Sequence, residues 1–169
     1  MAIVAGDIKI YFSGGSGNTD PNQSLGGAIS TTEMTNNSLH NLFDEVSGSE
    51  SLPGDIEYRG IYVKNTHGSL TAKSTKVYIS QASTSASSEI DIALAGEGLN
   101  ATIETIVNEG TAPAGETFSR PTTYSGGLSM GDIPTGQRYG LWIRRTIDAA
   151  ASAATPDEAR FKVDCDTDA

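Results

Sequence analysis

The sequence predicts an all-β domain, an antiparallel β-sandwich or jelly roll with one short helix. Gly, Ser and Thr make up about a third of the 169 residues, whereas Leu, Lys and Glu, which favour long helices, are scarce. Short segments in which apolar residues alternate with polar ones are separated by turn residues, at spacings of roughly 10–20 residues. These spacings suit an antiparallel sandwich better than βαβ units.

The first predicted strand covers residues 8–12. Ile8, Ile10 and Phe12 alternate there with more polar residues, which places the three apolar side chains on one face. The polar stretch that follows, 13–35, is longer than the roughly 12–15 residues that loops in compact domains rarely exceed. Residues 1–35 are therefore a candidate N-terminal arm and loop that reaches a neighbouring subunit.

The second predicted strand, 57–65, has apolar residues on both faces. Ile61 and Val63 share one face, whereas Tyr58 and Tyr62 share the other. A strand with two partly apolar faces is expected at the centre of a sheet or at a contact.

A hairpin turn is predicted over 65–68, with a positive φ at Gly68, and it leads into a strand over 76–80. Later segments repeat the alternation of apolar and polar residues. They predict strands at 88–95, 102–107, 117–120, 137–147 and 159–165.

One short helix is predicted between residues 37 and 48. Leu39, Leu42, Phe43 and Val46 have the i, i+3, i+4, i+7 spacing that forms one apolar stripe over about two turns. Asn or Ser can cap its start, and Gly48 can end it. Such a helix would close one open end of the sandwich.

Charge and cysteine content narrow the possible functions. Eleven basic and 21 acidic residues give a net charge of −10, which does not suit a phosphate backbone. The single cysteine, Cys165, excludes an internal disulfide framework and a cysteine-based zinc cluster. No apolar run approaches the roughly 20 residues that cross a bilayer, and no signal peptide is recognised. We expect one domain, 1–169, made in the cytoplasm, that binds neither a membrane nor nucleic acid directly.

Three motif-like stretches lack the residues that their chemistry requires. Gly127–Gly131 fits the nucleophile-elbow pattern, but both histidines precede it, and a turn between strands is the simpler interpretation. Gly96–Ala101 fits the dinucleotide fingerprint, but a short β-branched segment follows instead of an apolar helix. The alternating aspartates of 164–169 lack the Gly and Glu of a calcium loop and predict an acidic tail. We therefore expect no enzyme, no cofactor and no metal site.

The basic residues lie mostly in or beside predicted strands, and the acidic ones concentrate in predicted loops. This pattern leaves two interpretations open, namely ion pairs on a sheet surface or a basic sheet face that meets an acidic partner. Because Trp and Arg dominate interface hot spots, the strands 57–65 and 137–147 hold the candidate contact residues, with packing in the sheet as the alternative. These candidates are Trp142, Arg144, Arg145, Tyr58 and Tyr62.

Two parts of the chain resemble small structural proteins of tailed-phage virions. One contains EYRGIYVKNTHG (57–68) and TKVYI (75–79), and the other contains GETFSRP (115–121) and GQRYGLWIRRT (136–146). The resemblance implies a β-sandwich homo-oligomer assembled in many copies in the virion, with the major capsid protein or other virion proteins as partners.

The predicted function is that of a bacteriophage virion structural protein, most specifically a capsid decoration (cement) protein that stabilises the shell through protein–protein contacts. A tail, neck or baseplate component is the alternative within this class. A carbohydrate- or receptor-binding β-sandwich module is the alternative from another class. Such a module would expose aromatic residues in loops, whereas the single Trp and most Tyr residues here lie in strand patterns.

Overall fold

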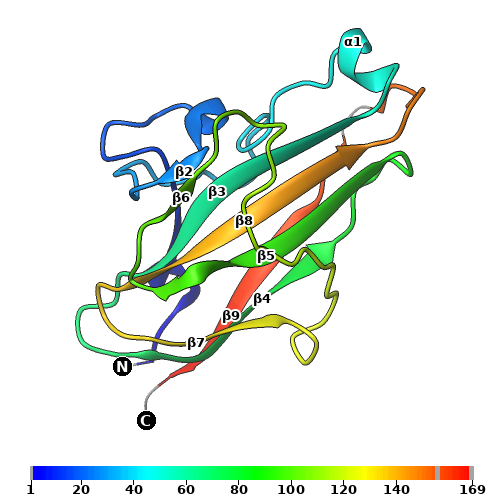
Figure 1. Ribbon diagram of the computed structural model, residues 1–169. Coiled ribbons are helices and arrows are strands. Elements are labelled where there is room, and N and C mark those ends of the chain that lie inside the picture. The colour runs from blue at the N-terminus through cyan, green and yellow to red at the C-terminus, as the bar shows by residue number, and fades with distance from the viewer. Residues whose placement is uncertain (1, 155–156, 168–169) are drawn as a thin grey trace.

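The computed structural model describes residues 2–154 and 157–167, and it consists mainly of antiparallel strands (Figure 1). A four-stranded sheet has the order β1-β3-β8-β5, and a three-stranded sheet has the order β7-β4-β9. The strands of the first sheet are β1 (Ile8–Phe12), β3 (Asp55–Asn65), β8 (Arg138–Ile147) and β5 (Ser88–Leu99). Those of the second are β7 (Leu128–Ile133), β4 (Ala72–Gln81) and β9 (Arg160–Thr167). The predicted all-β fold is confirmed.

The main core lies between the two sheets. Ile61 and Val63 of β3 and Leu141 of β8 belong to one buried apolar cluster with Val77 and Ile79 of β4. The predicted alternation along β3 and β8 is therefore correct, and β3 occupies the central position expected of a strand with two apolar faces.

A second core lies on the other face of the four-stranded sheet, beneath a layer of loops. It contains Tyr58, Tyr62 and Trp142 from the sheet, together with Ile103 and Ile106 from the covering chain. That covering chain includes the short strands β2 (Gly26–Gly27) and β6 (Ile103–Thr105), which pair with each other. We call the segments 13–30 and 101–111 the outer layer.

Residues 8–34 pack on their own chain instead of extending away from it. All five residues of β1 pair with β3. On the other edge of β1, the following loop forms backbone hydrogen bonds, such as that from the amide of Met34 to the carbonyl of Ile10 (2.8 Å). The fully buried Ser13 hydroxyl donates to the carbonyl of Gly60 (2.7 Å) and accepts from the amide of Gly26 (2.9 Å). Small polar side chains that find buried backbone partners thus hold this polar stretch against the sheet.

The predicted helix around residues 38–47 was wrong. Asn37 and His40 have φ values of 56° and 54°, which interrupt a right-handed helix, and Leu39 is 79% exposed. The structure has instead the short helix α1 (Gly48–Ser51), which a capping box between Ser47 and Glu50 starts. Two 3-10 turns, η1 (Ala5–Asp7) and η2 (Pro21–Gln23), accompany it.

Three further local predictions were also wrong. Residues 65–68 do not form a hairpin, because β3 and β4 belong to different sheets. The side-chain amide of Asn65 instead donates to the backbone carbonyls of Leu70 (2.8 Å) and Ile133 (2.9 Å). Residues 128–131 form part of strand β7 and not a turn. Residues 164–167 belong to β9 and not to a tail, and residues 168–169 lie outside the described residues.

Candidate functional site

The predicted interface residues lie side by side on β3 and β8 but mostly inside the chain. Trp142 and Tyr62 have no exposed surface, and Tyr58 and Arg145 are each 8% exposed. The side chain of Arg144 is 31% exposed. The outer layer covers the three aromatic residues, so a partner that approaches this face meets the covering loops first. A contact through these five residues stays a prediction.

A buried charged cluster lies below the end of the sandwich that carries α1. Arg59 has no exposed surface and Glu57 is 1% exposed, although both are on the core-facing side of β3. Arg59 Nη2 contacts Glu109 Oε2 at 2.5 Å, and Arg145 forms an ion pair with Glu57 and donates to the backbone carbonyl of Asp44 (2.7 Å). This cluster ties two loops, at residues 44 and 109, to the middle of the four-stranded sheet.

The ring of Phe43 contacts both arginines of this cluster. The guanidinium carbons of Arg59 and Arg145 are 5.3 and 4.9 Å from the ring centroid. Burial raises the pKa of Glu57, an effect that the neighbouring Arg145 and Arg59 oppose. Because a buried charge that loses its partner is costly, we expect removal of either arginine to destabilise the fold.

A second charged cluster connects the segment around residue 120 to β5. Arg120 Nη2 contacts Glu89 (2.8 Å) and Asp91 (3.1 Å), and Arg144 contacts the other oxygen of Asp91 (2.7 Å). Phe118 lies 5.1 Å from the Arg144 guanidinium. Arg59, Arg144 and Arg145 on β3 and β8 therefore pair with acids of the same chain, and this pairing accounts for their positions.

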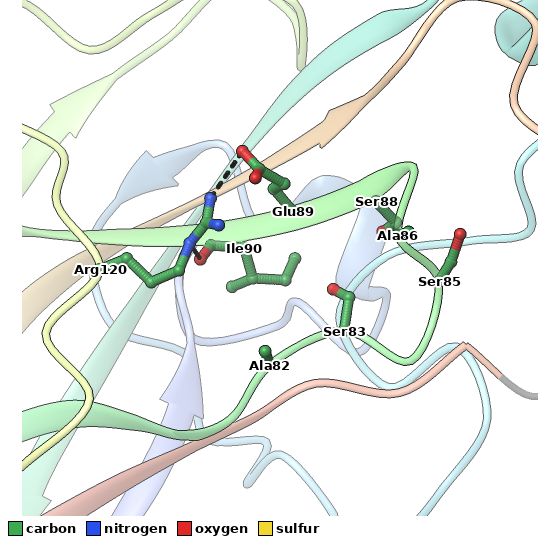
Figure 2. A pocket seen from close by; sticks show the side chains of 8 residues that line it. All are labelled: Ala82, Ser83, Ser85, Ala86, Ser88, Glu89, Ile90 and Arg120. Carbon is green, nitrogen blue, oxygen red and sulfur yellow. Dashed lines mark hydrogen bonds and ion pairs between the residues drawn. The ribbon is translucent and has the colours of Figure 1, made fainter.

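Figure 2 shows a small hollow next to this second cluster, with Arg120 at its edge and its side chain turned toward Glu89. The hollow measures about 190 Å³, and apart from Glu89 and Arg120 its lining consists of Ala, Ser and Ile side chains. Arg120 holds the pKa of Glu89 below its usual value. The only cation of the lining is thus already paired, and the hollow has no concentrated charge to offer a ligand.

Three exposed apolar residues lie in or close to the segments that line a shallow hollow near α1. Leu52 is 73% exposed, Ile56 43% and Val107 84%. A shallow hollow of about 510 Å³ lies between Pro53–Ile56, Gly110 and the end of β8. Val107 lies in the outer layer, three residues before Gly110. The neighbouring Glu109 joins this segment to β3, because its carbonyl accepts a hydrogen bond from the amide of Tyr58 (2.8 Å). We call Leu52, Ile56 and Val107, with the hollow, the apolar end.

Metal-binding and membrane-spanning features were also sought. Across residues 2–154 and 157–167, no group of three or more His, Cys, Asp or Glu side chains is placed to hold a metal ion. The same residues contain no helix with the length and hydrophobicity needed to cross a bilayer. Cys165 is half-buried, and burial raises the pKa of its thiol.

Comparison of the chain with family models, curated proteins and solved structures finds no match.

Sequence reasoning missed the buried charged cluster and the apolar end. A signal for the cluster was present, because Glu57 and Arg59 alternate in phase with Ile61 and Val63 and must therefore face the same core. The apolar end had no such signal. Leu52 and Val107 are isolated apolar residues outside the strands, and only the fold brings residues 53–56 and Gly110 together around one hollow.

Proposed function

We propose that this chain is a bacteriophage virion structural protein, most specifically a capsid decoration protein that binds the major capsid protein. The resemblance described above supplies the class, and the apolar end is the observation that carries the binding role. Single exposed apolar residues are ordinary, but here Ile56 lines the hollow, and Leu52 and Val107 precede its lining residues Pro53 and Gly110 by one and three positions. Exposed apolar side chains next to one hollow are what a contact surface requires.

The apolar end offers modest affinity per copy. Full burial of an apolar side chain contributes about 1.5–3 kcal/mol, from which the cost of association must be subtracted. A shell presents many equivalent sites, so a homo-oligomer that engages several of them gains avidity without any new contact.

The test measures occupancy of the chain on virions. We expect wild-type chain to co-purify with DNA-filled capsids in a density gradient at a fixed ratio to the major capsid protein. Val107→Asp and Leu52→Asp should each reduce this occupancy at least tenfold, because each would bury a charge at the contact. Leu99→Asp is the matched control, since Leu99 is also exposed (41%) but lies outside the apolar end.

Other outcomes decide between the alternatives. Co-purification with tails would assign the chain to the tail, neck or baseplate, and absence from both fractions would refute a virion role. Binding on a glycan array would favour a carbohydrate-binding module. Against that module, Tyr124 (37% exposed) is the only aromatic residue among the exposed large apolar side chains of the described chain.

A further inference from the structure

Among the described residues, no strand pairs with the outer edge of β9. β9 is the last strand of the three-stranded sheet and pairs only with β4, and no backbone hydrogen bond among the described residues reaches its other side. Phe161, Val163 and Cys165 face the core, yet all three are only half-buried. An exposed edge of this kind is a template for pairing with another strand.

The hydrogen-bonding groups on that edge can be assigned from β4. The amide of Ile79 donates to the carbonyl of Pro121 (2.8 Å), on the side of β4 away from β9. Ile79 is the register partner of Phe161, so this pair is not hydrogen-bonded within the sheet. Because β9 runs without a bulge from Phe161 to Thr167, the N–H and C=O groups of Phe161, Val163 and Cys165 point to the free edge.

The side chains of β9 are complementary to a second β9 that runs antiparallel. Along 160–166 the sequence reads Arg-Phe-Lys-Val-Asp-Cys-Asp, with the two cations before Val163 and the two anions after it. A twofold axis through Val163 places Lys162 opposite Asp164 of the second copy, and Arg160 opposite Asp166 of the second copy. The same axis pairs Val163 with itself, as a self-complementary interface requires.

The hydrogen bonds agree with this register. The groups of Val163 that point outward would bond those of Val163 in the second copy. Lys162 and Asp164 would then form the non-hydrogen-bonded pairs, in which opposing side chains approach most closely. Within one chain, Lys162 Nζ already contacts Asp164 Oδ2 at 2.9 Å, so two copies would join their charges in one alternating group of four.

We propose that two copies of this chain associate through antiparallel pairing of β9 about Val163, which joins the two three-stranded sheets into one six-stranded sheet. The proposal goes beyond the virion role and does not depend on it. A strand edge buries a small area, so the association is expected to be weak in dilute solution and to strengthen where many copies are held together.

The first experiment reverses charges and measures self-association of the full chain by sedimentation, from about 10 µM to about 1 mM, the range suited to a small interface. Wild type should dimerise with rising concentration. Lys162→Glu should weaken dimerisation about 10- to 100-fold, because two attractive pairs become repulsive. The double variant Lys162→Glu/Asp164→Lys should recover it. Lys64→Glu, an equal charge change on β3, is the control and should resemble wild type.

The second experiment tests the register and does not rely on the charge variants. Phe161→Cys should form an intermolecular disulfide with Cys165 of the second copy under mild oxidation, whereas Lys162→Cys, opposite Asp164, should not. The proposal is overturned if wild type stays monomeric at about 1 mM. It is also overturned if Lys64→Glu weakens the dimer as much as Lys162→Glu, or if both cysteine variants cross-link equally.

Discussion

Gly140→Ala tests whether the outer layer is packed directly onto the four-stranded sheet. A Cβ built at Gly140 would overlap Cγ2 of Ile103 in β6 and lie 2.9 Å from Cβ of Ala95. Gly60 of β3 lies diagonally opposite Gly140 of β8, and a Cβ there would also come too close to Ile103, at 2.8 Å from its Cδ1. The two glycines together leave the space that Ile103 fills.

The expected cost follows from two opposing effects. Overpacking a core costs about 1–3 kcal/mol. Replacing Gly by Ala also lowers the conformational entropy of the unfolded chain, which stabilises the folded state by about 0.4–1 kcal/mol. The net loss of about 1–2 kcal/mol corresponds to a fall in Tm of about 2–8 °C for a domain of this size. Gly6→Ala is the control, because a Cβ there meets nothing within 4 Å.

A double-mutant cycle then identifies the cause. Ile103→Ala alone should cost about 2–5 kcal/mol. It also removes the methyl group that Gly140→Ala would meet, so the double variant should be more stable than additivity predicts, by about 1 kcal/mol or more. Chemical denaturation measures all four free energies of unfolding. The reasoning is refuted if the two effects on the free energy of unfolding are additive, or if Gly140→Ala has the same free energy of unfolding as wild type.

Two further predictions concern the charged clusters. Arg59→Ala should lower the free energy of unfolding by about 3–5 kcal/mol, because it leaves Glu57 buried with one partner fewer. Arg160→Ala, in an exposed ion pair, should change the free energy of unfolding by less than about 1 kcal/mol. Equal effects of the two substitutions in denaturant titrations would contradict this prediction. Arg120 lowers the pKa of Glu89, so the pair stabilises the fold above the ordinary value of 4.5 and this contribution is lost as pH falls below it. The Tm difference between wild type and Glu89→Gln should therefore shrink from about pH 6 to about pH 3, and a constant difference would count against the pairing.

The strand pattern was predictable where one residue in two faces a core. β3, β5, β8 and β9 all alternate clearly, and their faces in the structure agree with the sequence. β7 does not alternate regularly, because its buried residues Met130 and Ile133 are three positions apart where the register with β4 shifts, and its glycines favoured a turn. The pairing of strands is a different matter, because periodicity carries no information on which sheet a strand joins. The failed hairpin after β3 has this cause.

The helix failed for a related reason. Its apolar stripe contained Phe43, whose ring packs against the Arg59 and Arg145 guanidiniums, and Leu39, which is exposed. A helical spacing therefore arose from residues with unrelated roles. The outer layer was equally hidden, because polar residues such as Ser13 and Ser24 are buried there through backbone hydrogen bonds. Such burial depends on distant carbonyl groups that no local pattern shows.

The two proposed contact surfaces belong to different parts of the molecule. The apolar end lies where β3 begins and β8 ends and is supported by the buried charged cluster, whereas the β9 edge belongs to the three-stranded sheet. A dimer joined at β9 would carry two apolar ends and could bridge two sites on a shell. This arrangement links the self-association to the proposed function without making either depend on the other.

Amide hydrogen exchange of the full chain at low and high concentration tests most directly whether the chain works through contacts between protein copies. Pairing about Val163 predicts that the amides of Phe161, Val163 and Cys165 become protected as concentration rises. The amides of Lys162 and Asp164, which face β4, should be protected at every concentration. Exchange of all five amides that does not change with concentration, up to about 1 mM, would contradict the account.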